Sequence, residues 1–375
     1  MKQNARIAEI DKTCNRCGRC AIECRFLQLY GLPGDIAMDV LAGGQNNGVD
    51  LSFKCSLCGL CGAVCPLHLN PKDMFLDMRK HAYETDRISL KTYRAILQYE
   101  KRGTSRLFTW YSFPDGCHTI FFPGCTLPGT RPHQTEKLFA CLKKKIPDLG
   151  IVLDCCTKPS HDLGRQRYFE DMFFEMKAFL TGNNIRGVIT ACPNCYKVFS
   201  LYGREFDVKM AYPFINSNDV SLHRADGIGP LVIHDPCVLR GESGMHDAVR
   251  QLVASQGYPI DPMSHSGHKT FCCGEGGSVA FTDKALALNW AMLRKEEASG
   301  KRVITYCAGC AGFLNRIIPA NHLLDLLFDP KGVRTGRSRV AKAPFTYVNR
   351  MKLKKRLRKN EPGAVTRERC FKAAE

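Results

Sequence analysis

At 375 residues and 44% hydrophobic content, the chain is too long for one simple core and too apolar for wholesale disorder, so two or three domains are expected. The formal charge of +18 is concentrated in residues 331–375, where 15 Lys and Arg face three Asp and Glu, so it does not mark the whole chain as nucleic-acid-binding. No apolar run approaches the roughly 18–20 residues of a membrane span, and the start, MKQNARIAEIDK, lacks the hydrophobic core of a secretion signal, so we expect a cytoplasmic protein.

The chain contains 21 cysteines, which require an explanation. A disulfide framework is typical of small secreted domains. Reduced cysteines in a chain of this length are more often metal ligands, and their spacing decides between the two interpretations.

Residues 1–80 contain two cysteine runs, each spaced C-x₂-C-x₂-C-x₃-C. This spacing is typical of a pair of [4Fe–4S] cubane clusters, because a tight loop supplies three thiolates and the opposite run supplies the fourth. Zinc sites favour paired C-x₂-C knuckles instead. The predicted ligands are Cys14, Cys17, Cys20 and Cys65 for one cluster, and Cys55, Cys58, Cys61 and Cys24 for the other.

Residues 81–116 are expected to form a helical linker. Beyond them, short β-branched runs that end in cysteine alternate with amphipathic stretches, which predicts α/β units with a largely parallel sheet. The run HTIFFPGC returns as PLVIHDPC, and VITACPNC returns as VITYCAGC. Matching cysteines are separated by a near-constant offset of about 115 residues, which indicates a tandem duplication. We place the two copies at 117–215 and 216–329.

Each copy contributes five cysteines in three groups, and every group follows a predicted strand. Because the carboxyl ends of parallel strands meet at one edge of a sheet, the groups of one copy can converge on one point. Glycines such as Gly274, after the adjacent pair, permit the tight turn that aims two neighbouring sulfurs at one site. The groups are Cys125, Cys155, Cys156, Cys192 and Cys195 in copy one, and Cys237, Cys272, Cys273, Cys307 and Cys310 in copy two.

Here the sequence resembles a known family. The pattern C…CCG…C-x₂-C, present twice, is similar to the cysteine-rich (CCG) domain of heterodisulfide reductase, and the double ferredoxin motif before it is similar to its D subunit. The C subunit of anaerobic glycerol-3-phosphate dehydrogenase and the iron–sulfur subunit of glycolate oxidase share the arrangement. The resemblance covers about residues 10–329. It implies a non-cubane [4Fe–4S] cluster held by five thiolates in each complete copy, with a disulfide substrate bound between two such clusters.

The two copies match this family to different degrees. Copy two matches in full, so its five cysteines are the expected catalytic set, and those of copy one are expected to bind a cofactor. In copy one Thr157 replaces the glycine after the pair, and a zinc ion remains an alternative there, because four or five thiolates suit zinc equally well.

Several histidines lie near cysteine groups in the sequence. They are candidates for supplying protons, although a lone histidine at a strand end is more often a structural hydrogen-bonding residue. His322, after the final group, is expected to cap or pack the last helix. The proton candidates are His161, His234, His265 and His268.

Residues 330–375 are expected to form a partly disordered basic tail, apart from a short basic helix at YVNRMKLKKRL. Three roles stay open for it: peripheral contact with anionic lipid on the inner membrane face, docking to an acidic partner subunit, and simple solvation.

The overall expectation is an α+β multidomain protein, with a mostly helical two-cluster ferredoxin-like domain followed by a duplicated α/β cysteine-rich domain. We predict an iron–sulfur oxidoreductase subunit of anaerobic metabolism that passes single electrons through two cubanes to or from a CCG site, which acts on a disulfide/thiol couple or a quinone. The alternatives are a non-catalytic subunit that links a flavin dehydrogenase to membrane quinone, and a zinc-bearing interaction protein. Because the nucleotide-binding glycine fingerprint is missing from the sequence, a flavoprotein or another heterodisulfide reductase-like subunit is the expected redox partner.

Overall fold

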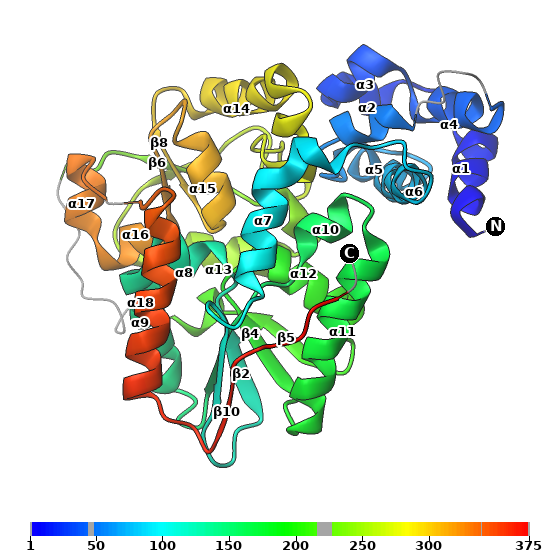
Figure 1. Cartoon of the computed structure of the whole chain (residues 1–375). Helices are drawn as coiled ribbons and strands as arrows, with labels where there is room; N and C mark the ends of the chain where they lie inside the picture. Colours follow the sequence, from blue (N-terminus) through cyan, green and yellow to red (C-terminus); the bar gives the residue numbers. More distant parts are fainter. Residues whose placement is uncertain (1, 44–48, 216–226, 339, 374–375) are drawn as a thin grey trace.

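The computed structural model describes residues 2–43, 49–215, 227–338 and 340–373. Figure 1 shows an N-terminal group of helices (blue) beside two sheets that carry helices on their faces. This mixed α/β architecture agrees with the fold class predicted from the sequence. The expected boundary between the two copies, at 215–216, falls at the edge of a range outside the described residues.

The N-terminal part is built from short helices. Two of them begin with a proline, α4 at Pro33 and α6 at Pro71. Proline lacks a backbone N–H, and the N–H groups of the first helical turn have no partner within the helix, so proline is well tolerated there. Helix α7 leads from this part to the first sheet (Figure 1). The elements are α1 (Lys2–Thr13), α2 (Arg19–Glu23), α3 (Arg25–Tyr30), α4 (Pro33–Leu41), η1 (Asp50–Lys54), α5 (Leu60–Ala63), α6 (Pro71–Glu84), η2 (Leu90–Tyr93) and α7 (Arg94–Gly103).

The first sheet has the strand order β10-β1-β3-β2-β4-β5. Strands β3, β2, β4 and β5 are parallel, whereas β1 and β10 pair antiparallel at one edge. Successive residues of β2 point to opposite faces: Ile120 and Phe122 pack with α11 and α12, and Phe121 packs with α9. The elements are β1 (Trp110–Phe113), β2 (Thr119–Phe122), α8 (Thr126–Thr130), α9 (Pro132–Lys143), β3 (Gly150–Leu153), α10 (Lys158–Asp162), α11 (Gln166–Gly182), β4 (Gly187–Thr190), α12 (Pro193–Tyr202), β5 (Asp207–Met210), η3 (Tyr212–Phe214) and β10 (Val365–Arg367).

The second sheet has the order β7-β6-β8-β9, and all of its pairings are parallel. Val232 and Val303 face α14, whereas Ile233 and Ile304 face α13. The elements are β6 (Leu231–His234), η5 (Cys237–Leu239), α13 (Ser243–Ser255), β7 (Ile260–Asp261), η6 (Gly267–Lys269), η7 (Gly276–Phe281), α14 (Lys284–Ala298), β8 (Arg302–Thr305), α15 (Ala308–Leu314), β9 (Ala320–His322), α16 (Leu323–Phe328) and α17 (Pro330–Thr335).

The parallel strands of the two sheets follow the same order. In the first sheet these strands run in the order β3-β2-β4-β5, and in the second they run β7-β6-β8-β9. In both sheets the strand that comes first in the chain lies between the second and the third, and the fourth lies beyond the third. One apolar core joins the N-terminal helices to one face of the second sheet, and another joins the opposite face to the first sheet. The N-terminal helices also contact the first unit directly, because Arg79 of α6 donates a 2.7 Å hydrogen bond to the carbonyl of Asp162 at the end of α10.

The partly disordered tail expected for residues 330–375 is not what the structure contains. Helix α18 (Phe345–Asn360), which matches the predicted basic helix, buries Leu353 and Leu357 in the core on the α9 face. Figure 1 shows α18 (red) running beside α8 and α9, and β10 then pairs with β1. The density of basic residues predicts solvation, but Leu353 and Leu357 pack against the first sheet unit, and the buried Arg350 and Lys354 on the same helix donate to the carbonyls of Gly103 and Arg106. None of the helices in the described part of the chain is both long and apolar enough to cross a bilayer.

Candidate metal centres

The first cysteine run forms the loop between α1 and α2. Gly18, with a φ of 75°, turns the chain so that Cys20 enters α2. Gly34 of α4 lies close behind, since a Cβ there would be 3.0 Å from the Cβ of Cys14. One small cavity is lined by Cys14, Cys17, Cys20, Cys61 and Cys65. The fold thus brings Cys65 of the second run to the first run, as the crossed ligand assignment requires.

The second cysteine run is more deeply buried. Burial raises the pKa of Cys55 to about 12, and burial together with the sulfurs of Cys58 and Cys55 raises the pKa of Cys24. Cys24 of the first run therefore lies with the second run. The Leu57 N–H donates a hydrogen bond to the Cys55 sulfur over 3.4 Å, a contact that favours a thiolate.

In the first α/β unit, the cysteines gather at the carboxyl ends of β2, β3 and β4. The Cys155 thiol donates to the Cys125 sulfur over 3.8 Å, and this hydrogen bond lowers the pKa of Cys125 to about 6. The Cys195 and Cys156 sulfurs are 3.4 Å apart. Gly124 permits this convergence, because a Cβ there would lie 3.0 Å from the Cβ of Cys192.

The second α/β unit repeats the arrangement. Cys237 and Cys273 both hydrogen-bond to Cys272, and this lowers the pKa of Cys272 well below its usual value. Cys310 contacts Cys273 and Cys307 in turn, and all five cysteines are connected. At Gly274, with a φ of 99°, an added Cβ would overlap the carbonyl oxygen of Ala287.

The position after the cysteine pair differs in the first unit. Thr157 occupies the left-handed region with a φ of 53°, is buried, and its hydroxyl has no hydrogen-bond partner among the described residues. A β-branched residue rarely adopts this conformation. Both units therefore have a positive φ after the cysteine pair, and the first unit places a β-branched residue where the second has a glycine.

The cysteine groups follow one another in space. Burial raises the pKa of Cys58, and the nearby Cys272 sulfur raises it further. The second cysteine run therefore lies beside the second α/β unit. The two units meet at Tyr212, whose hydroxyl donates to the carbonyls of Ala191 at 2.6 Å and Tyr306 at 3.1 Å. These two residues immediately precede Cys192 and Cys307.

Comparisons with known proteins agree with this geometry. Residues 13–70 match the model of the 4Fe-4S dicluster domain. Residues 119–200 and 231–315 both match the model of the cysteine-rich domain known as CCG. The chain belongs to the CCG-domain iron–sulfur proteins.

Three curated relatives are similar over most of this chain. A probable membrane-anchored ferredoxin of Chromohalobacter salexigens is 30% identical over 71% of this chain and 45% of its own length. The probable iron-sulfur-binding oxidoreductase FadF of Bacillus subtilis is 20% identical over 69% of this chain and 42% of its own. The D subunit of the dihydromethanophenazine:CoB–CoM heterodisulfide reductase of Methanosarcina barkeri is 24% identical over 75% of this chain and 82% of its own.

This chain spans less than half the length of the first two relatives. Among solved structures, an aspartate racemase of Picrophilus torridus covers 62% of this chain and 100% of its own at 11% identity. Its TM-score of 0.25 is too low to support any conclusion about the fold.

The donor sets of this CCG-domain protein fit iron–sulfur clusters. Each N-terminal set offers four sulfurs from two runs, and each CCG unit offers five sulfurs in contact with one another. Soft thiolate ligands select iron–sulfur clusters, zinc or copper(I). The family match indicates [4Fe–4S] clusters among these choices.

Three cysteines lie outside these sets. Cys117 and Cys141 are buried in the first unit, and Cys370 is exposed. The Cys117 thiol donates to the carbonyl of Thr119 over 3.3 Å, a local structural contact.

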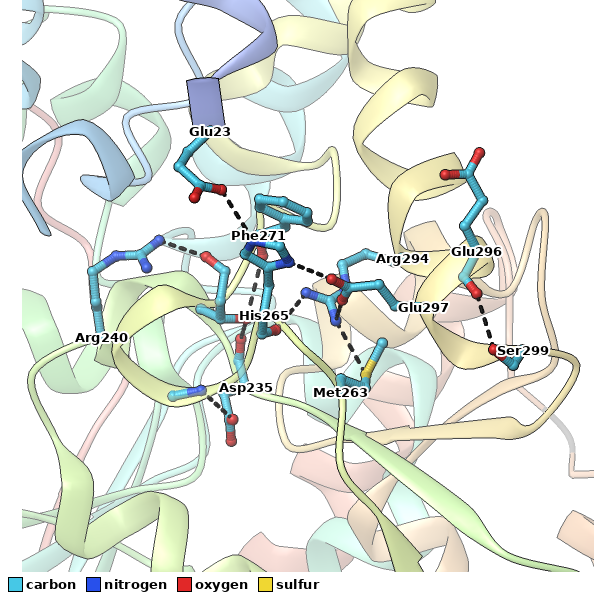
Figure 2. A network of polar contacts seen from close by, with 12 residues as sticks. Glu23, Asp235, Arg240, Met263, His265, Phe271, Arg294, Glu296, Glu297 and Ser299 are labelled. Atoms are coloured by element: carbon cyan, nitrogen blue, oxygen red, sulfur yellow. Dashed lines mark hydrogen bonds and ion pairs between the residues drawn. The ribbon is translucent and has the colours of Figure 1, made fainter. Parts of the chain in front are cut away.

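The histidines proposed from the sequence as proton donors take different places. Figure 2 shows His265 bridging the N-terminal helices to the second unit: its Nε2 is 3.0 Å from Glu23, and its Nδ1 pairs with Glu297. His161 contacts Asp162 and Tyr202, at 2.9 and 2.8 Å. Both are structural in these contacts, and His268 is exposed.

The other two histidines are fully buried. His322 caps α16, because its Nδ1 accepts from the Leu324 N–H at 3.1 Å, and this confirms the expected capping role. His234 alone of these histidines lies among the cysteines, with Cys273 and Cys310.

Sequence reasoning missed Glu275, which lies between the two CCG units. Its carboxylate lies against Gly309, inside the Cys307–Cys310 loop, and leaves no room for a side chain there. Glu275 is exposed to solvent, yet the protein atoms around its carboxylate and the Cys272 sulfur raise its pKa to about 7. Cys125 of the first unit contributes to the same effect. The glycine in C-A-G-C was the one feature of the sequence that pointed to this contact.

Proposed function

We propose that this chain is an iron–sulfur oxidoreductase subunit that exchanges single electrons between two N-terminal cubanes and its CCG units. The cubane ligands would be the two crossed sets, and each CCG unit would hold a non-cubane [4Fe–4S] cluster through its five cysteines. The clusters supply one-electron transfer, and the protein fixes their order and surroundings. A zinc ion in the first unit remains the alternative to iron there. The common strand order of the two sheets supports descent from one duplicated unit.

One observation carries this proposal: the cysteine groups form a continuous series. The N-terminal sets adjoin through Cys20 and Cys61, and Cys58 adjoins Cys272 of the second unit. Tyr212 and Glu275 then lie between the second unit and the first. Such a series suits electron relay, whereas isolated structural metal sites need no such order.

The substrate would react between the two CCG units. A disulfide or a quinone accepts two electrons, and the thiols or the quinol formed also take up protons. Glu275 is the carboxyl positioned to hold a proton between the units, on a carboxylate oxygen beside Gly309. Relatives named as the D subunit of a heterodisulfide reductase and as an iron-sulfur-binding oxidoreductase support this class of reaction.

Anaerobic purification of the full chain, with iron and zinc counts and electron paramagnetic resonance, tests this function. We expect roughly 16 irons if all four sites hold four-iron clusters and about 12 if one CCG unit holds zinc. After oxidation, added thiol should produce a new paramagnetic species that is missing from a Cys272→Ser, Cys310→Ser double variant. A folded, iron-free protein would contradict the proposal.

The second candidate is a non-catalytic subunit that links a flavin dehydrogenase to membrane quinone. Thr157 favours it, because the strained position in the first unit departs from the full motif of the second. The conduit should pass electrons from reduced viologen to a quinone analogue but not to disulfides. Disulfide reduction that is lost in the double variant would favour the catalytic function.

We further propose a cytoplasmic location with peripheral contact to anionic lipid or to an acidic subunit through α18. Its exposed side carries Lys352, Lys355 and Lys359 at helical spacing. Co-sedimentation with vesicles containing anionic lipid should be lost in a Lys352→Glu, Lys355→Glu variant. Unchanged sedimentation would exclude this surface as the point of contact.

A further inference from the structure

A buried imidazole lies among the sulfurs of the second CCG unit. His234 is the last residue of β6, three positions before Cys237, and none of its surface is exposed. One of its ring nitrogens and the Sγ atoms of Cys273 and Cys310 all lie within 4.8 Å of one another. These cysteines come from two different groups, so the ring faces the point where the groups converge.

This ring has no hydrogen bond. Neither nitrogen of His234 has a partner among the described residues, although buried polar groups almost always do. The charged side chains that act on its ring, Arg294 and Asp235, are engaged elsewhere. Arg294 donates to the carbonyl of His265 and to Glu297. The carboxylate of Asp235 accepts from Arg250, the Gly267 N–H and Tyr306.

A limit of 4.8 Å is compatible with two ligands of one metal atom. Zinc, for example, binds a histidine nitrogen at about 2.1 Å and a thiolate at about 2.3 Å, so a tetrahedral metal holds the two donors roughly 3.6 Å apart. A nitrogen this close to two sulfurs, yet hydrogen-bonded to neither, leaves a metal as the partner that would satisfy it. We propose that His234 is a further ligand of the metal centre in the second CCG unit, in addition to its cysteines.

The first unit has no histidine at the equivalent position to serve as such a ligand. Phe122 stands three positions before Cys125, where His234 stands before Cys237. Its ring packs edge-on against Phe199 with centroids 5.1 Å apart. The two units therefore offer different donor sets, one of sulfur alone and one of sulfur with nitrogen.

This inference rests on the proposed function, because it requires a metal in the second unit. The test uses the full anaerobic chain grown with ¹⁴N- or ¹⁵N-histidine, studied by pulsed electron paramagnetic resonance. We expect a histidine nitrogen strongly coupled to the centre that disappears with the Cys272→Ser, Cys310→Ser change. The coupling should also vanish in His234→Phe, which copies the first unit, and persist in His268→Phe, a control at an exposed position.

A second variant keeps the test decisive if His234→Phe does not fold. In His234→Ala, added ¹⁵N-imidazole should restore the coupling, and added ¹⁴N-imidazole should give the corresponding ¹⁴N signal. If the second unit contains iron but wild type lacks a coupled histidine nitrogen, or the coupling survives in His234→Phe, His234 is not a ligand and this inference alone fails. If the double variant contains as much iron as wild type, the proposed function fails instead.

Discussion

Gly277 packs so closely against the carbonyl oxygen of Cys55 that any side chain at position 277 would overlap it. The neighbouring Gly276 repeats this contact, since a Cβ there would lie 2.6 Å from the carbonyl oxygen of Ser56. The CCGEGG loop of the second unit thus rests directly on the second cysteine run. The glycines permit a close backbone approach, and this approach brings two predicted cluster sites together.

Gly277→Ala should therefore separate the two sites. The added Cβ overlaps the Cys55 carbonyl, and the φ of 61° is unfavourable for alanine, so we expect a loss of about 1–3 kcal/mol in the free energy of unfolding. Thermal unfolding of the anaerobic protein measures it. Gly182→Ala is the matched control, because nothing lies within 4 Å of its Cβ position. Equal melting temperatures for the two variants would contradict the contact.

Arg79 holds the same junction together from within. Its fully buried guanidinium donates to backbone carbonyls of three parts: Ser52 and Cys55 of the N-terminal part, Gly277 of the second unit and Asp162 of the first. Lysine lacks the planar fork needed for this, so Arg79→Lys should leave buried carbonyls unsatisfied at about 1–3 kcal/mol each. Denaturant unfolding should show a marked loss relative to Arg87→Lys, at an exposed position. If the two variants unfold alike, Arg79 does not secure the junction.

The arrangement of the cysteines was largely predictable. The C-x₂-C-x₂-C-x₃-C spacing predicted that Cys24 and Cys65 exchange runs, and the structure brings each to the opposite run. The strand-end placement of Cys192 and Cys307 followed from hydrophobic runs such as VIT. These features are local, because a few consecutive residues determine both the turn and the direction of the sulfurs.

The contacts between distant segments were not predictable. Glu275 reaches the Cys307–Cys310 loop, and Tyr212 joins two loops that are far apart in sequence. The basic tail was misread for the same reason. Its charges indicate solvation, but Arg369 pairs with Asp154 across 215 residues, and neither side chain is exposed. Pattern reasoning on one segment cannot identify a partner on another.

This last pair gives a third prediction. Arg369→Met removes the cation beside Asp154, which immediately precedes Cys155, and leaves a buried carboxylate with Tyr111 as its remaining side-chain partner. Breaking a buried ion pair typically costs about 3–5 kcal/mol. We expect a lower melting temperature and loss of metal from the first unit first. Lys372→Met, at an exposed position, should change neither quantity. Full metal retention at the wild-type melting temperature would show that the tail is dispensable.

The two N-terminal clusters should differ in their sensitivity to oxygen. Cys17 is exposed, and the other three cysteines of its set are half-buried. In the second set Cys58 is half-buried, and Cys24, Cys55 and Cys61 are buried. Exposed clusters are reached first by oxygen and solvent. On exposure to air, iron should therefore be lost in two phases, with the paramagnetic signal of the Cys17 cluster fading first. A Cys17→Ser variant identifies that phase, and loss in a single phase would contradict the assigned difference in burial.

Glu100 should make the stability of the protein depend on pH. Burial raises the pKa of Glu100 from 4.5 to about 7, although its carboxylate accepts hydrogen bonds from the N–H and hydroxyl of Ser160. Because the folded pKa lies above the unfolded one, the neutral carboxyl is favoured on folding. This contribution is full below pH 4.5 and is lost as the pH rises through 7. The glutamine variant does not titrate, so it should escape the loss.

The free energy of unfolding of Glu100→Gln, relative to wild type, should therefore rise by about 2 kcal/mol between about pH 5.5 and pH 8. Denaturant unfolding of anaerobic protein at the two pH values measures this difference. Glu9→Gln, at an exposed position on α1, serves as the control and should follow wild type at both. A difference between Glu100→Gln and wild type that is the same at both pH values would mean that Glu100 is already ionised in the folded protein. The Ser160 hydrogen bonds would then outweigh its burial.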